Sequence, residues 1–135
     1  MERTAAAVYC DLEEHGVVVF EYPMKKGPCI SSQDGFLAID SRDLTSTEEY
    51  TALIHERGHF KSGAFYTPYS PYQIKAQAEY RADRSAILDS IPYNEMAAQL
   101  NSGLELWELA EHFGVTEDYC LKAYLFYKDR YGMIA

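Results

Sequence analysis

Residues 46–60 of the chain read STEEYTALIHERGHF, and the end of this stretch, from His55 to His59, fits the pattern HExxH. Residues four apart lie one above the other on the same face of a helix. The two imidazoles can therefore point at one metal ion, while Glu56 lies beside any water that the ion holds. This pentapeptide is the most informative feature of the chain, and the other predictions are built around it.

The residues around the motif predict that it lies on a helix. Ser46 and Glu49 fit the S-x-x-E capping box, an apolar stripe follows at helical spacing, and Gly63 ends the helix after about Phe60. A metal-activated water beside a general base is the chemistry of zinc peptidases. HExxH also arises by chance on ordinary amphipathic helices, so the interpretation requires a third ligand.

The next predicted helix supplies that ligand. Residues 70–73 fit a second capping box, with Pro71 at the first helical position, and good helix formers continue to about Leu88. Glu79 and Asp83 are four residues apart on this helix and share a face. Because a catalytic zinc site uses three protein ligands, and two histidines with one glutamate form a known set, we predict Glu79 as the third ligand.

Asp83 has a different predicted role. It is placed to accept the N–H of a ligating histidine, a contact that fixes the tautomer of the ring. Two alternatives stay open. Glu79 and Asp83 could form a solvated acidic face with partners such as Lys75, and Asp89 could be the ligand if the helix had a different register.

These motifs resemble those of the ImmA/IrrE family of metallopeptidases. That family is recognised by a helical HExGH and a downstream E-x-x-A-[N/D]; this chain has HERGH at 55–59, EYRAD at 79–83 and Ile91-Pro92 beyond them. The similarity covers roughly residues 15–127. One departure is visible, because Ser85-Ala86 stands where the family often has an aromatic-alanine pair.

The resemblance implies a role for each matching residue. His55, His59 and Glu79 would hold a zinc ion, Glu56 would be the catalytic base, and Asp83 would occupy the Asn/Asp position. Zinc would lower the pKa of a water towards about 7, and Glu56 would take its proton as the water attacks a peptide carbonyl.

The tetrahedral intermediate of such a reaction needs a further electrophilic partner. The sequence offers several candidates and does not choose among them: Tyr66, Tyr69, Tyr72, Tyr80 and His112. The connection over residues 61–70 is rich in Gly, Tyr and Pro, and it either rims the cleft or simply joins the two helices; of these, we favour the rim.

Family members are often encoded beside a repressor on prophages or conjugative elements, and they cleave that repressor. By this analogy we expect an anti-repressor endopeptidase whose substrate is a helix-turn-helix repressor. Three alternatives stay open: a metal-containing regulatory binding module that relieves repression without proteolysis, a toxin–antitoxin or phage-neck component that reuses the fold, and a helical regulator in which HExxH is accidental.

Length and composition favour a small intracellular enzyme. The 135 residues suit one domain, and 47% of them are hydrophobic. No stretch approaches the length of a membrane span, and the amino terminus lacks the features of a signal peptide. The three cysteines are odd in number and widely spaced, as expected for free thiols in a reducing compartment. We therefore expect a cytoplasmic protein.

A net charge of −9 argues against direct nucleic-acid binding. Residues 109–116 read like a helix-turn-helix core, with Gly114 as the turn and Thr116 as the next cap. However, residues 104–127 contain five acidic side chains and the single basic residue Lys122. We therefore predict that these helices pack against the core and do not bind DNA.

The predicted fold is α+β, with a small antiparallel or mixed sheet packed on a helical bundle, as in zincins. A single domain over 1–135 would contain the sheet at 16–40, the metal-binding helix pair at 46–90 and C-terminal helices at 93–128. Asp34-Gly35 predicts a hairpin. The remaining expected elements are a helix at 3–14, strands at 16–22, 29–31 and 36–40, and helices at 93–100, 104–112 and 117–127.

Overall fold

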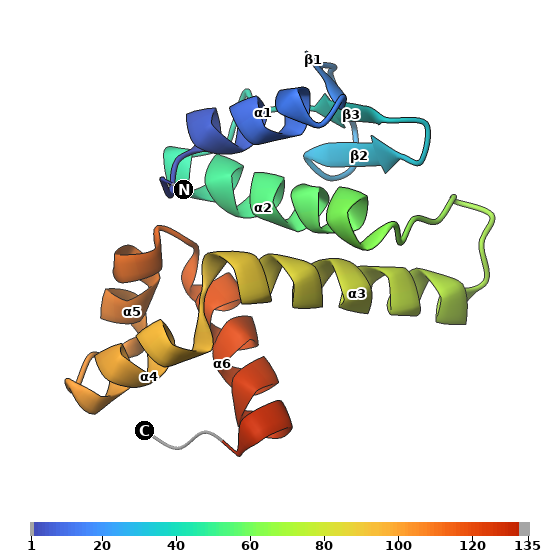
Figure 1. Ribbon diagram of the computed structural model, residues 1–135. Helices are drawn as coiled ribbons and strands as arrows, with labels where there is room; N and C mark the ends of the chain where they lie inside the picture. The colour runs from blue at the N-terminus through green and yellow to red at the C-terminus, as the bar shows by residue number, and fades with distance from the viewer. Residues whose placement is uncertain (1, 133–135) are drawn as a thin grey trace.

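The computed structural model describes residues 2–132 and has the predicted α+β fold (Figure 1). The ends of the predicted domain range, residues 1 and 133–135, lie outside this part of the chain. The described elements are α1 (Ala5–Glu14), β1 (Val18–Glu21), β2 (Cys29–Ser32), β3 (Phe36–Ile39), α2 (Ser46–Ser62), α3 (Tyr72–Ser90), α4 (Tyr93–Asn101), α5 (Leu106–Phe113) and α6 (Glu117–Tyr131).

The three strands form a mixed sheet in the order β1-β3-β2. β1 pairs with β3 in parallel and β2 pairs with β3 antiparallel, so the predicted hairpin at Asp34-Gly35 is confirmed. Gly35 has a φ of +95°, which a side chain rarely tolerates. Side chains alternate between faces along a strand, and Leu37 and Ile39 of the central strand are buried on the inner face.

The N-cap of the helix that carries HExxH lies one residue before the predicted cap. Thr45 is the N-cap, and its hydroxyl accepts the Glu48 N–H at 3.1 Å while the Glu48 carboxylate accepts the Thr45 N–H at 2.9 Å. The predicted Ser46–Glu49 box is therefore wrong, because Thr45–Glu48 fits the same pattern. Glu49 instead accepts the hydroxyl of Tyr9 at 2.6 Å.

The predicted cap of α3 is also wrong. Ser70 accepts the N–H of Thr67 at 2.9 Å and closes a turn in the preceding loop. Pro71 takes the cap position, where its carbonyl accepts the N–H groups of Ile74 and Lys75, and no side chain caps the helix. Proline is compatible with this boundary because its fixed φ suits the entry to a helix.

α2 and α3 run antiparallel through the middle of the molecule (Figure 1). Gly58 allows them to approach closely, because a Cβ at this position would lie 2.2 Å from the carbonyl oxygen of Ala82. Ala82 and Ala86 are buried in α3, as expected for small residues at a close helix contact. α1 and the sheet lie on one side of α2, and α3 lies along the other.

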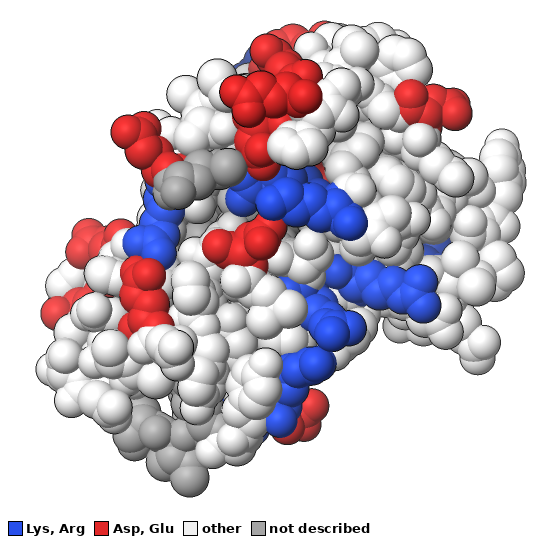
Figure 2. Space-filling model, in the orientation of Figure 1, with Lys and Arg blue, Asp and Glu red and all other residues white. Residues whose placement is uncertain are grey.

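The C-terminal helices pack on the core as predicted. Phe113 and Cys120 are fully buried, Gly114 ends α5 with a φ of +71°, and Thr116 caps α6 by accepting the N–H of Tyr119. Acidic side chains lie over the α5 region in Figure 2, whereas basic ones form a band over α3 and α6. Among residues 2–132 no helix combines the length and the hydrophobicity that crossing a membrane requires.

Candidate metal centre

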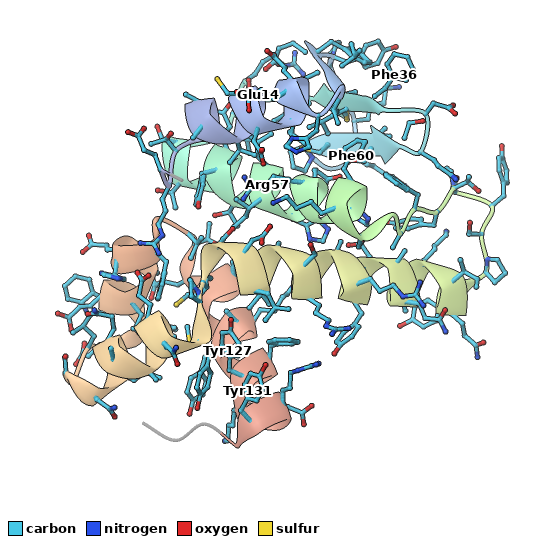
Figure 3. The ribbon with its side chains drawn as sticks, viewed as in Figure 1. Glu14, Phe36, Arg57, Phe60, Tyr127 and Tyr131 are labelled. Atoms are coloured by element: carbon cyan, nitrogen blue, oxygen red, sulfur yellow. The ribbon has the colours of Figure 1, made fainter. Side chains whose placement is uncertain are left out.

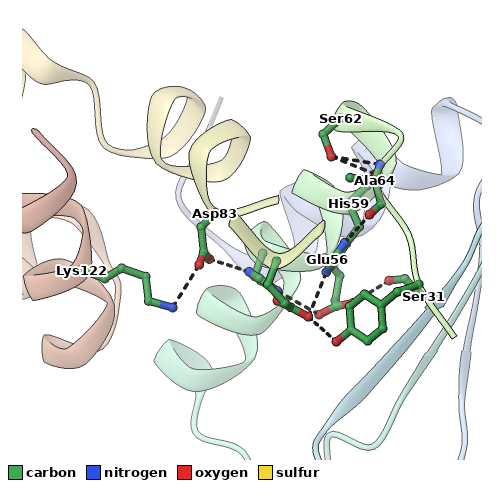
Figure 4. A network of polar contacts seen from close by, with 10 residues as sticks. Ser31, Glu56, His59, Ser62, Ala64, Asp83 and Lys122 are labelled. Atoms are coloured by element: carbon green, nitrogen blue, oxygen red, sulfur yellow. Dashed lines mark hydrogen bonds and ion pairs between the residues drawn. The ribbon is translucent and has the colours of Figure 1, made fainter. Parts of the chain in front are cut away.

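Three side chains from two helices converge on one point. The candidate ligand atoms of His55, His59 and Glu79 all lie within 4.8 Å of one another. The Nε2 atom of His55 is 2.7 Å from one carboxylate oxygen of Glu79, and the Nε2 atom of His59 is 3.6 Å from the other (Figure 4). The structure therefore brings together the three residues that the sequence predicted as ligands.

The other nitrogen of each ring already has a partner. His55 Nδ1 lies 2.8 Å from a carboxylate oxygen of Asp83, and His59 Nδ1 lies 2.7 Å from the carbonyl oxygen of Ala64. Both partners are acceptors, so each Nδ1 carries the proton that it donates. Each Nε2 atom is consequently the one directed at the shared point, as in histidine-ligated metal sites.

Hydrogen bonds and opposite charges within the cluster stabilise the charged forms of its histidines and of Glu79. Burial opposes the charged form of His55, but hydrogen bonds to Asp83 and Glu79 and the nearby charge of Glu56 raise its pKa to about 10. The pKa of His59 is also raised, because its bonds to Glu79 and Ala64 outweigh the same burial. The histidine hydrogen bonds lower the pKa of Glu79 below its ordinary value.

The donor set fits a divalent metal ion. Ligand atoms around a tetrahedral zinc ion lie roughly 3.3 Å apart, given zinc–nitrogen and zinc–oxygen distances near 2.0–2.1 Å. The 2.7 Å and 3.6 Å separations, each to a different oxygen of Glu79, lie on either side of that value. Two imidazole nitrogens and one carboxylate oxygen suit zinc and also other divalent ions.

Glu56 lies beside the cluster, with one carboxylate oxygen 4.0 Å from His55 Nε2. Its other oxygen accepts the hydroxyl of Ser31 at 2.6 Å. Ser31 lies on β2 and could not be predicted from the sequence, because no motif marks it. Its hydrogen bond orients the Glu56 carboxylate.

Tyr66 is the one electrophile candidate that the structure brings to the cluster. Its hydroxyl donates to Glu79, and this bond together with burial raises its pKa to about 12. Tyr69 is 95% exposed and Tyr72 is 83% exposed. Tyr80 is also exposed, and His112 hydrogen-bonds Glu95 on a different part of the chain: these four candidates are not in the cluster.

A cleft of about 190 Å³ opens in front of Glu56 and His59. Its other walls are Ile30 and Ser31 of β2 and residues 65–68 of the loop between α2 and α3. The predicted rim segment 61–70 therefore contributes to the lining. Apolar groups form much of this surface, which would exclude water from the polar cluster on one side.

Lys122 connects α6 to the cluster. Its ammonium group donates to the second oxygen of Asp83 at 3.2 Å, so Asp83 bridges Lys122 and His55 (Figure 4). In the sequence, Lys122 stands out only as the single basic residue of an acidic region. Asp89, the competing ligand candidate, instead forms an ion pair with Lys61 at 2.7 Å.

The chain was compared with protein families, curated proteins and solved structures, and none of them matches it significantly. What the site can do is therefore argued from its own residues. They form a group that could hold a divalent ion, with a carboxylate and a phenol beside it and a cleft that reaches them.

Proposed function

We propose that this protein is a zinc-dependent endopeptidase that cleaves a partner protein. The observation that carries the proposal is the convergence of His55, His59 and Glu79 beside a cleft that is lined by His59 and Glu56. A cluster with no chemical role would not need two histidines whose Nδ1 atoms are both fixed by acceptors.

Each residue at the cleft has a separate role in the proposed hydrolysis of a peptide bond. A bound zinc ion supplies Lewis-acid activation of a water molecule and of a carbonyl oxygen. Glu56 accepts a proton from the water and delivers it to the leaving amine, while Ser31 holds the carboxylate in place. Tyr66, whose hydroxyl hydrogen-bonds Glu79, would donate a hydrogen bond to the oxygen on which negative charge develops.

The proposed substrate is a helix-turn-helix repressor encoded beside the enzyme on a prophage or mobile element. This part of the proposal rests on the resemblance of residues 55–59 and 79–83 to the ImmA/IrrE motifs. A shallow, partly apolar cleft suits an extended segment of a protein better than a small polar metabolite.

The ligand set is tested by elemental analysis of purified protein loaded with zinc and then desalted. We expect about one zinc ion per chain for the wild type and loss of that ion in Glu79→Ala. Asp89→Ala is the matched control, because it removes a carboxylate from the same helix outside the cluster, and it should retain the metal. Equal zinc contents in the two variants would contradict the ligand assignment.

Peptidase activity is tested with Glu56→Gln, which should keep the metal and stop cleavage. Incubation with a library of proteome-derived peptides, followed by mass spectrometry of new amino termini, reveals which peptides the wild type cleaves and at which bond. Co-expression with the neighbouring repressor then tests the specific partner. Relief of repression by Glu56→Gln equal to that by the wild type would instead favour a metal-containing binding module.

A further inference from the structure

One face of the small sheet is apolar and open to solvent. Its large side chains are all between 42% and 61% exposed, and we call them the outer sheet face: Val18, Phe20, Tyr22, Ile30 and Phe36. Figure 3 shows Phe36 at the boundary of the molecule, away from α2. Scattered exposed hydrophobic residues are normal, but a continuous patch of this kind marks an interaction site.

The strand register explains why these residues gather. Val18 lies opposite Phe36, and Phe20 and Ile30 both lie opposite Ala38 on the central strand. Because side chains alternate along each strand, all of them point away from the inner face that holds Leu37 and Ile39. The sheet therefore has one face packed in the core and one apolar face without cover from the described residues.

A parallel strand pair with a bare face is unusual. Sheets with parallel strands are normally covered on both sides, while an antiparallel sheet that faces water carries polar side chains there. Besides Tyr22, which directly follows β1, six residues of the strands lie on this face: Val18, Phe20, Ile30, Ser32, Phe36 and Ala38. Of these six, only Ser32 is polar and none is charged.

We propose that the outer sheet face binds the same face of a second copy of this chain. A two-fold contact is self-complementary, since the same patch serves both partners. Like charges that meet in such a contact are costly, and the whole chain has a net charge of −9. The outer sheet face avoids this cost because it places no charge at the centre of the interface.

The area of the face matches what a stable dimer needs. A standard interface removes about 800 Å² from each partner, of which about 65% is apolar in homodimers, or roughly 500 Å² per chain. Its three aromatic side chains are each about half exposed and offer roughly 100 Å² apiece, given about 200 Å² for an aromatic side chain, and Val18 and Ile30 add to this area. Two such sheets would pack face to face as a small sandwich.

The dimer would border the candidate active site without forming part of it. Ile30 belongs to the outer sheet face and also lines the cleft in front of Glu56. The second copy would therefore lie beside the mouth of each cleft. The dimer itself does not depend on the proposed function, because it rests on the sheet alone.

Light scattering coupled to size exclusion tests the dimer over a range from about 1 µM to about 100 µM. We expect the wild type to reach twice its chain mass of 15.4 kDa. Phe20→Glu should weaken the dimer roughly a hundredfold or more, since it places two like charges in the contact. Leu125→Glu is the matched control, because Leu125 is also half exposed but lies on α6, and it should leave the dimer intact.

Circular dichroism of each variant verifies its fold, and Phe20→Glu should keep the wild-type spectrum because Phe20 is outside the core. A wild type that stays at 15.4 kDa throughout the range would overturn the proposal, whatever the variants do. So would a dimer that Phe20→Glu leaves unchanged, or one that Leu125→Glu disrupts to the same extent.

Discussion

Two helix pairs of this molecule carry patterns that suggest a function, and only one pair assembles a site. In α2 and α3, histidines and carboxylates from both helices meet at one point. In α5 and α6, the helix-turn-helix-like residues bury Phe113 and Cys120 against the core, and acidic side chains face solvent. A pattern therefore indicates chemistry when separate elements bring polar groups together, and packing when they bring together apolar ones.

The largest expected difference between the two pairs is in catalysis. Glu56→Gln should lower peptidase activity about a thousandfold, because general-base catalysis contributes about 10²–10⁴. Glu111→Gln makes the same chemical change on α5, away from the cleft, and should leave activity within about twofold. Initial rates on the best peptide from the library measure both. A Glu56→Gln variant with full activity would remove this residue from the mechanism.

Glycine substitutions test the packing of each pair. Gly58→Ala should cost about 3 kcal/mol and release the metal, because its Cβ would meet the Ala82 carbonyl oxygen at 2.2 Å and force α2 and α3 apart. Gly114→Ala has room for its methyl group but a φ of +71°, so it should cost only about 1–2 kcal/mol. Urea unfolding and zinc content measure the two effects.

If Gly58→Ala keeps both its stability and its zinc, the close contact between α2 and α3 does not position the site. If Gly114→Ala proves the more damaging of the two, the C-terminal pair contributes more to the fold than the metal helices do.

A smaller effect is expected at the link between the two regions. Asp83→Asn should lower zinc affinity by about 10–100-fold, because partners of ligating histidines typically contribute that much. Asp118→Asn on α6 is the control and should have no effect. Competition with a chromophoric chelator gives both affinities. Unchanged affinity in Asp83→Asn would mean that the His55–Asp83 bond does not support the metal site.

The sequence predicts the parts of the site that depend on spacing within a helix. His55 and His59 share a face through their four-residue separation, and Glu79 and Asp83 do so in the same way. The α+β class also follows from local patterns. The division of the domain into subregions remains a prediction. The metal-binding and catalytic roles of the site residues also remain predictions, because the structure gives their positions and not their activity.

Other parts of the site depend on tertiary packing and had no local signal. Ser31 and Lys122 reach the cluster from a strand and from α6, and no motif marks either of them. Tyr66 reaches it from a loop, and the sequence named it among five candidates without a basis for choosing it. The exposure of the outer sheet face could not be predicted from the sequence for a similar reason. Residues 17–20 form a continuous apolar run, which reads as a buried strand and does not reveal that Val18 and Phe20 face solvent.

The smallest predicted effect is a pH dependence in the C-terminal region. Hydrogen bonds from Arg3 and His112 outweigh partial burial and lower the pKa of Glu95 below its ordinary value. A lowered folded-state pKa stabilises the protein above the unfolded-state value of about 4.3, and this contribution disappears as the pH falls through the folded-state pKa. Because the Arg3 and Glu95 side chains are each 32% exposed, we expect less than about 1 kcal/mol.

Urea unfolding of the wild type and Glu95→Gln at several pH values measures this contribution. The variant should be slightly less stable at pH 7, and the difference should shrink steadily below about pH 4, as the wild-type carboxylate becomes protonated. Glu105→Gln serves as the control, because its carboxylate has no basic partner among the contacts of the described residues. If the stability difference between the wild type and Glu95→Gln grew as the pH fell, it would have the wrong sign for this mechanism. The Arg3–Glu95 ion pair would then not explain how α4 interacts with the amino-terminal segment.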